Sequence, residues 1–142
     1  MEKDFNTYLA NLAIWNAKLH NIHWNVVGMQ FVAVHEFTEA EYDKAFERFD
    51  EVAEHFKMYG YTPVSTLKEY LELATIKEIE PKAFSCKEAI EIVLADMELM
   101  RDMATKLRND SDEQGWFSAV SIFEDHVNDY NKQIWFMKSM LA

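Results

Sequence analysis

Apolar residues recur three and four positions apart along most of the chain, and this spacing is typical of helices that bury one face. The first series lies between Asp4, a residue suited to cap a helix start, and Gly28, a residue suited to follow a helix end. A second series runs from Val32 to Gly60. The two series consist of Leu9, Leu12, Leu19, Ile22 and Val26, and of Tyr42, Ala45, Phe46, Phe49, Val52, Ala53 and Phe56. The sequence therefore predicts two long helices joined by a short turn.

Three patterns of the type Ser/Thr-x-x-Glu/Gln, each suited to a helix start, predict the remaining helices. "TLKE" at residues 66–69 predicts a short helix that ends at Leu73, "SCKE" at 85–88 predicts a third long helix, and "SDEQ" at 111–114 predicts a fourth with Gly115 in its first turn. The apolar positions of the third and fourth helices are Ile90, Val93, Leu94, Met97, Ala104 and Leu107, and Phe117, Val120, Val127, Ile134, Met137 and Leu141.

Four long helices of similar length favour an all-α four-helix bundle that forms a single domain over residues 1–142. The connection between the second and third long helices is long and carries the short helix. A crossover of that length lets the third helix run parallel to the second.

The composition agrees with a long-helix globular protein, since the chain is 49% hydrophobic and has only 3 glycines and 2 prolines. Cys86 is the only cysteine, which excludes an internal disulfide and favours a reducing compartment. The first residues lack the pattern of a signal peptide, and no apolar run approaches the roughly 20 residues that a membrane span needs. We therefore expect a cytoplasmic protein without a membrane partner.

The charge balance argues against DNA as a partner. Lys and Arg number 14 and Asp and Glu 25, which gives a formal net charge of −11, and no local basic arm offsets it. Such a surface repels nucleic acid and attracts metal cations.

Candidate metal ligands fall on the first two helices. Three of the five histidines are close together, at His20, His23 and His35, and an antiparallel helix pair brings His23 and His35 to the same end of a bundle. Asp50 and Glu54 are four positions apart, hence on one helix face, which suits a divalent cation. Each pair also has a purely structural interpretation, as packed histidines or as a solvated acidic face.

Geometry limits how these ligands can combine. His35 and Asp50 are separated by 15 positions of one helix, or about 22 Å at 1.5 Å per residue, so they cannot share one metal within one chain. If they share a site, a second chain must place its helix antiparallel across a two-fold axis, which gives two equivalent sites per pair.

The segments "KLHNIHWNVVGMQFVAVHEF" (18–37) and "YDKAFERFDEVAEHFKMYGYTPVSTLKEYL" (42–71) closely resemble the Dps family of mini-ferritins. The family motif is His-Trp, a second histidine twelve residues later, and then Asp-x-x-x-Glu on the next helix. His23 and Trp24, His35, Asp50 and Glu54 match it at the family's spacing.

This resemblance implies a ferritin-like bundle and a homo-oligomeric shell, a dodecamer. It also implies a ferroxidase site shared between two subunits, in which His23 and His35 come from one chain and Asp50 and Glu54 from its two-fold mate. Such proteins oxidise Fe(II) to Fe(III), preferentially with hydrogen peroxide, and store the ferric mineral, which protects against oxidative stress. The family's alternative activity is DNA binding and compaction.

The roles of other residues stay open at this point. Trp24 is either an electron donor, as is suggested for the family, or a packed aromatic residue, and His20 either orients the site or contacts solvent. We expect His55 and His126 to be surface or interface residues. The chain has no Glu-x-x-His, which argues against an iron centre inside one bundle. Candidate acids for an iron-entry pore are Asp110, Asp112 and Glu113.

Overall fold

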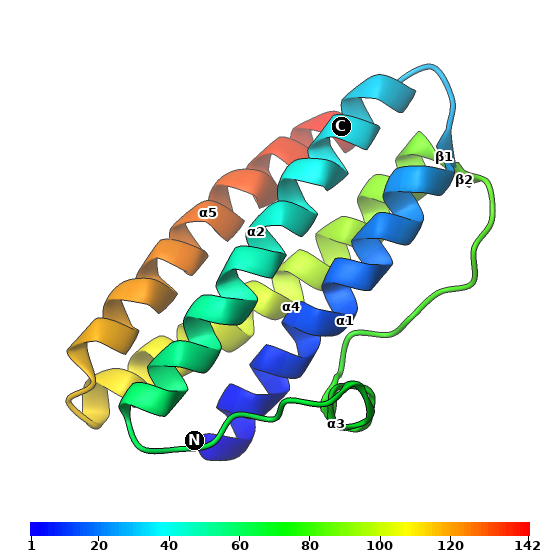
Figure 1. Ribbon diagram of the computed structural model, residues 1–142. Coiled ribbons are helices and arrows are strands. Elements are labelled where there is room, and N and C mark those ends of the chain that lie inside the picture. The colour runs from blue at the N-terminus through cyan, green and yellow to red at the C-terminus, as the bar shows by residue number, and fades with distance from the viewer.

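The computed structural model describes all residues from Met1 to Ala142 as one bundle of four long helices (Figure 1). No helix is long and apolar enough to cross a membrane. The elements are α1 (Glu2–Asn25), β1 (Val26–Val27), α2 (Phe31–Met58), α3 (Leu67–Leu73), β2 (Phe84–Ser85), α4 (Cys86–Glu113) and α5 (Phe117–Leu141).

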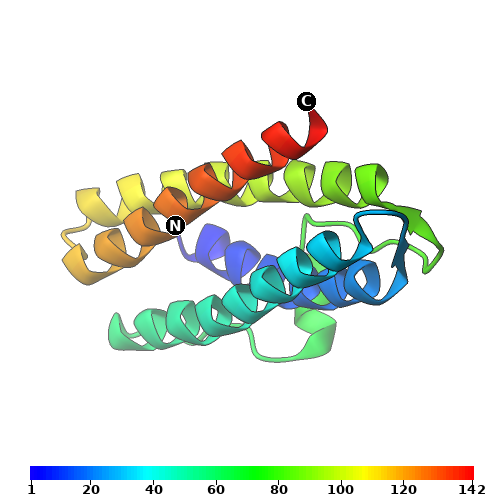
Figure 2. The ribbon, with the colours of Figure 1, turned by 90° about the horizontal axis from the view of Figure 1, so that it is seen from above.

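The long helices pack as two antiparallel pairs, α1 with α2 and α4 with α5, and Figure 2 shows the second pair lying over the first. The chain leaves the end of α2, passes through α3 and returns along the bundle to the end at which α2 begins (Figure 1). Therefore α4 runs parallel to α2, and the predicted bundle with a short helix in its crossover is confirmed. Strands β1 and β2 pair in parallel, with Val26 opposite Phe84, and join the end of α1 to the start of α4.

Large side chains fill the centre between the two pairs. Phe5 of α1 stacks on Phe56 of α2 at 5.0 Å between ring centroids and meets the edge of Phe123 of α5 at 5.3 Å. Burying one such side chain stabilises the fold by about 1.5–3 kcal/mol. The largest fully buried side chains are Trp15, Tyr8, Tyr130, Phe5, Phe56, Phe84 and Phe123. Aromatic residues therefore join α2 and α5 to α1.

The hydrophobic periodicity overestimates burial at two predicted core positions. Phe46 is 67% exposed and Phe117 is 75% exposed, so neither belongs to the core of this chain. Each lies at the edge of its helix's apolar stripe, where no other helix of this chain covers it. The buried face of α5 consists instead of Ala119, Ile122, Phe123, His126, Tyr130, Ile134 and Met137.

The predicted boundaries of the first helix are wrong at both ends. Helix α1 begins at Glu2, and Asp4 lies within its first turn, where the carboxylate accepts a hydrogen bond from Lys106 of α4. Helix α1 ends at Asn25, three residues before Gly28. It ends there because Val26 is extended and pairs with Phe84.

The predicted start of the fourth long helix is also wrong. "SDEQ" lies at the end of α4, which continues to Glu113 and buries Ser111. Gly115 has φ +75°, and the N–H groups of Gly115 and Trp116 donate to the carbonyls of Asp112 and Ser111. This is the Schellman arrangement, which ends a helix at a left-handed glycine. The other two starts are confirmed, since Thr66 and Ser85 each accept the N–H of the residue three positions later.

Buried polar side chains connect α1 to the rest of the chain. The amide of Asn11 donates to Thr75 Oγ1, and its oxygen accepts from the N–H groups of Thr75 and Ile76 in the crossover. Lys18 pairs with Asp96 of α4 at 2.7 Å, with both side chains largely buried. His126 is only 2% exposed, so its predicted surface position is wrong; its ring bonds Tyr8 and Glu51, which replace water.

The turn between α1 and α2 lies against the start of α4. Gly28 has φ +128°, a conformation that residues with a Cβ rarely adopt, and an added Cβ would lie 3.2 Å from Cys86 Sγ. The Cys86 thiol donates to the carbonyl of Val27 at 3.4 Å. Gly28 therefore allows the turn between α1 and α2 to approach the start of α4 closely.

We predict that Gly28→Ala lowers the free energy of unfolding by about 2 kcal/mol or more, because it adds a contact to a strained backbone. Gly115→Ala is the matched control: φ is again positive but nothing lies within 4 Å of the new Cβ, so we expect a loss of about 1 kcal/mol. Urea unfolding at one fixed protein concentration measures both. Equal losses would show that the contact with Cys86 is without effect.

Candidate metal centre

His23 and His35 face each other where α1 turns into α2. Their rings stack at 3.6 Å between centroids with an interplanar angle of 14°. His23, in the last turn of α1, is 5% exposed, while His35, in the first turns of α2, is half-buried. The prediction that the turn brings these two histidines together is confirmed.

Reciprocal hydrogen bonds fix the protonation pattern of both rings. The Nδ1 atom of His23 lies 2.7 Å from the carbonyl oxygen of His35, and Nδ1 of His35 lies 2.8 Å from that of His23. A carbonyl oxygen only accepts, so each Nδ1 carries a proton and donates it. In the neutral rings both lone pairs are then at Nε2, the atom that remains free to bind a metal.

Two residues that the sequence did not single out support this pair. The hydroxyl of Thr38 donates to the carbonyl of Val34 or His35 and accepts from His23 Nδ1 at 3.1 Å, so it holds the His23 ring in place. The ring of Phe31 stacks on His35 at 4.9 Å. The sequence does contain a signal for Thr38. Threonine is a poor helix former, and at i+3 from His35 within a helix it often marks a side chain used for hydrogen bonding.

His20 belongs to the same group of side chains, one helical turn before His23. Its Nδ1 donates to the carbonyl of Asn16 at 2.7 Å, and its ring stacks on Tyr42 at 3.7 Å. The edge of Tyr42 also meets His23 at 5.2 Å, so Tyr42 connects the two histidines. Trp24 is 69% exposed, which excludes a packed core position within this chain.

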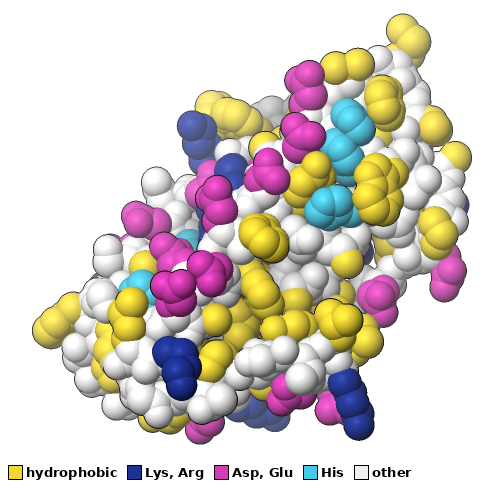
Figure 3. Space-filling model, viewed as in Figure 1, with side chains coloured by type: hydrophobic (Ala, Val, Ile, Leu, Met, Phe, Trp, Pro, Cys, Tyr) yellow, Lys and Arg dark blue, Asp and Glu magenta, His cyan; other side chains and the backbone are white.

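Asp50 and Glu54 are exposed on α2 and make no hydrogen bond or ion pair within the chain. Two other acids of α2 differ from them, since Glu51 accepts a hydrogen bond from His126 and Glu41 accepts one from Lys44. Figure 3 shows one group of histidine side chains towards the upper end of this face, further histidine surface towards the lower end, and acidic side chains distributed along the face.

Nowhere in the chain do three metal-binding side chains converge. The fifteen helical positions between His35 and Asp50 keep the two pairs about 22 Å apart, as expected for one continuous helix. The structure therefore brings His23 to His35 and leaves Asp50 with Glu54 as a separate, unpaired group.

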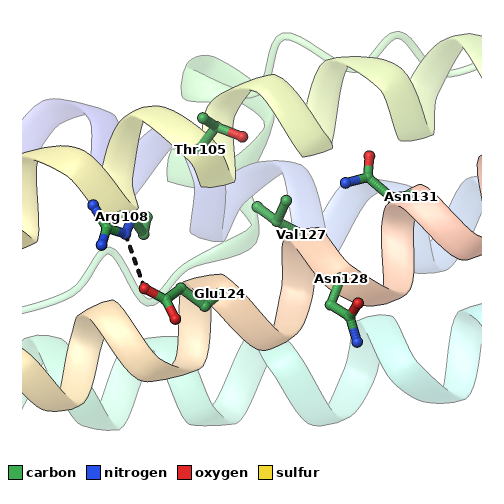
Figure 4. Close-up of a pocket in the computed structure, with 6 residues that line it drawn as sticks. All are labelled: Thr105, Arg108, Glu124, Val127, Asn128 and Asn131. Atoms are coloured by element: carbon green, nitrogen blue, oxygen red, sulfur yellow. Dashed lines mark hydrogen bonds and ion pairs between the residues drawn. The ribbon is translucent and has the colours of Figure 1, made fainter.

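The hollows of the surface do not add ligands to these groups. One hollow of about 290 Å³ lies between α4 and α5, where Arg108 donates to Glu124 at 3.0 Å and Asn128 and Asn131 line the wall (Figure 4). It contains none of the predicted site residues. The candidate pore acids lie at the end of α4, where Asp110 bonds Lys106 and Asp112 pairs with Arg108.

Comparisons with known proteins bear on this arrangement. The family model of the ferritin-like domain matches residues 2–142. The "DNA protection during starvation protein" of Helicobacter pylori is 32% identical over 125 residues, 88% of this chain and 87% of its own, and that of Listeria innocua is 33% identical over 144 residues, 99% of this chain and 91% of its own. The crystal structure of Helicobacter cinaedi CAIP superposes with a TM-score of 0.96 at 35% identity and covers 99% of both chains.

Proposed function

This chain belongs to the Dps branch of the ferritin-like family, and on that premise we propose that it stores iron as a homo-oligomeric shell. The shell takes up Fe(II), oxidises it at its subunit interfaces, preferentially with hydrogen peroxide, and retains the ferric product. Removing both reactants limits the formation of hydroxyl radicals and so protects the cell. The observation that carries this proposal is the pair of stacked histidines with both Nε2 lone pairs free, together with a separate, exposed carboxylate pair that has no partner in the chain.

The iron site in this proposal is shared between two subunits. Helix α2 of a second subunit lies antiparallel across a two-fold axis and brings Asp50 and Glu54 to the histidines of the first. The exposure of both carboxylates supports this, because an exposed acid without a partner in its own chain is available to another chain. Oligomerisation is then a condition for activity.

The ligand types fit iron as the substrate. Carboxylate oxygens stabilise Fe(III) more than Fe(II) and so favour oxidation, while imidazole nitrogens keep a useful affinity for Fe(II). Asp50 and Glu54 are the main anchors. His23, held by two acceptors and nearly buried, binds iron directly, and His35, which has one acceptor and is half-buried, binds directly or through water at a second iron.

DNA binding is the alternative, since the relatives from Helicobacter pylori and Listeria innocua carry the name "DNA protection during starvation protein". A net charge of −11 per chain disfavours it, because phosphate contacts need Lys and Arg that exceed the surrounding acids. Iron oxidation requires no such surface, so we rank DNA protection by direct binding second.

We predict that Asp50→Ala combined with Glu54→Ala abolishes rapid peroxide-dependent oxidation of Fe(II), because the main oxygen ligands are lost. The matched control is Glu98→Ala with Asp102→Ala, which removes two carboxylates at the same spacing from α4. Stopped-flow absorbance of the ferric product measures the rate, and size-exclusion chromatography checks the assembly. Wild-type rates in an intact Asp50/Glu54 double variant would refute the site.

His23→Gly should weaken the binding of Fe(II) more than His35→Gly does, because His23 is the more rigidly held ligand. Anaerobic equilibrium titration with Fe(II) measures the affinity of each assembled variant. The reverse order would show that His35 is the direct ligand.

We expect no retardation of duplex DNA by the metal-free protein in a gel-shift assay at low salt, where any electrostatic attraction is strongest. The assay should be repeated with Mg²⁺, which can bridge acidic groups to phosphates. Retardation without metal would favour the DNA-binding alternative.

A further inference from the structure

A continuous line of hydrogen bonds runs from the core of the bundle to its surface, away from the histidine pair. Tyr130 of α5 bonds the hydroxyl of Tyr8 of α1 at 2.9 Å, and that hydroxyl bonds Nδ1 of His126 at 2.9 Å. Nε2 of His126 then bonds Glu51 of α2 at 2.9 Å. Tyr8 and Tyr130 are fully buried, while the Glu51 side chain is 45% exposed at the edge of a hollow of about 200 Å³.

When Glu51 is ionised, every hydrogen bond in this line has one direction. The carboxylate of Glu51 only accepts, so Nε2 of His126 carries a proton, and Nδ1 has the lone pair of the neutral ring. The Tyr8 hydroxyl therefore donates to Nδ1, and the Tyr130 hydroxyl donates to the oxygen of Tyr8. Tyr8 is a phenol hydrogen-bonded to a neutral imidazole inside a bundle that excludes water.

Burial and the charges around His126 keep its ring neutral, so that Nδ1 has a lone pair. Burial, together with the positive charge of Arg48, lowers the pKa of His126 to about 3, although Asp129 raises it. The ring is therefore neutral near pH 7. Burial raises the pKa of Tyr8, which stays protonated until an electron is removed from it.

We propose that Tyr8 is a redox-active residue that gives up an electron to a strong one-electron oxidant while its proton passes to Nδ1 of His126. The oxidant is the hydroxyl radical formed when Fe(II) cleaves peroxide in a one-electron step. This choice of oxidant is the only part of the proposal that rests on the proposed function. An oxidised phenol is a very strong acid, so a base as weak as His126 still takes its proton.

The step balances in electrons and protons. Fe(II) and peroxide give Fe(III), hydroxide and a hydroxyl radical; the radical takes one electron and becomes a second hydroxide. Tyr8 becomes a neutral tyrosyl radical and His126 an imidazolium. A second Fe(II) then returns an electron to Tyr8, and His126 returns the proton. The sum is two Fe(II) oxidised by one peroxide, with no radical left.

The properties of the neighbouring aromatic residues favour Tyr8 as the residue that stays oxidised. Trp15 lies 6.2 Å from Tyr130 between ring centroids, and its buried indole N–H has no acceptor, so oxidised Trp15 has no base to take its proton. The guanidinium of Arg48 lies 4.8 Å from the centre of the Tyr130 ring and opposes positive charge there. Trp15 can therefore pass the oxidation on to the tyrosines, and of Trp15, Tyr130 and Tyr8 only Tyr8 is hydrogen-bonded to a base.

The first test uses no iron. Metal-free shells are photo-oxidised with a ruthenium tris-bipyridine sensitiser and persulfate, frozen, and measured by electron paramagnetic resonance, with ring-deuterated tyrosine to identify a tyrosyl signal. We expect a long-lived tyrosyl signal in the wild type that Tyr8→Phe removes and His126→Gln strongly reduces. Tyr70→Phe is the matched control, since Tyr70 is buried but its hydroxyl bonds no base, and it should retain the signal.

The second test mixes Fe(II)-loaded shells with peroxide and freezes them at successive times. We expect the same Tyr8-dependent signal, which disappears when more Fe(II) is added. A signal unchanged by Tyr8→Phe, or none in the photo-oxidised wild type, overturns the assignment of Tyr8. If the tyrosyl signal appears after photo-oxidation but not after Fe(II) and peroxide are mixed, the proposed oxidation of Tyr8 by the products of peroxide is wrong. Absence of iron oxidation altogether, with the photochemical signal intact, refutes the proposed function and leaves Tyr8 as the redox-active residue.

Discussion

The continuity of α2 is the constraint on which the rest of the molecule depends. An unbroken helix holds His35 and Asp50 about 22 Å apart, and no bend or loop within one chain can bring them together. The histidine pair is fully formed in the single chain, with rings stacked and Nδ1 protons fixed by backbone carbonyls. Asp50 and Glu54 likewise lie side by side on one face of α2 in the single chain, but neither has a hydrogen-bonding or ionic partner there. Each chain therefore presents two separate groups, and in the proposed function it is assembly that brings the histidines of one chain to the carboxylates of another.

Much of this arrangement follows from local sequence. Helix periodicity gave the number and order of the long helices, because amphipathic stripes of this length have few other ways to bury their apolar face. The turn at Gly28 brings His23 to His35, as their placement on consecutive antiparallel helices predicts. The errors were also local. "SDEQ" fits a helix start by composition, yet Gly115 ends the preceding helix just after it, and the longer α4 gains more from continuing than from stopping at Ser111.

The hydrogen-bond partners of the buried polar side chains could not be predicted from the sequence. Tyr8 and His126 are 118 positions apart, and nothing local indicates that a histidine on α5 lies against a tyrosine on α1. The sequence alone predicts a surface or interface position for His126, because nothing near it in the chain indicates partners for a buried ring. Its burial depends on two partners from other helices that satisfy both ring nitrogens. Such networks are a property of the assembled bundle, and the same holds for the contacts of Asn11 with the crossover.

The separation of the histidine pair from the carboxylate pair has a consequence in genetics. With a shared site, a subunit defective at His23 and a subunit defective at Asp50 would complement each other when they pair. One interface of the mixed pair would carry both lesions, and the other would join the intact histidines of one subunit to the intact carboxylates of its mate. Two inactive alleles expressed together would then restore part of the activity, and only residues on opposite sides of the interface would behave in this way.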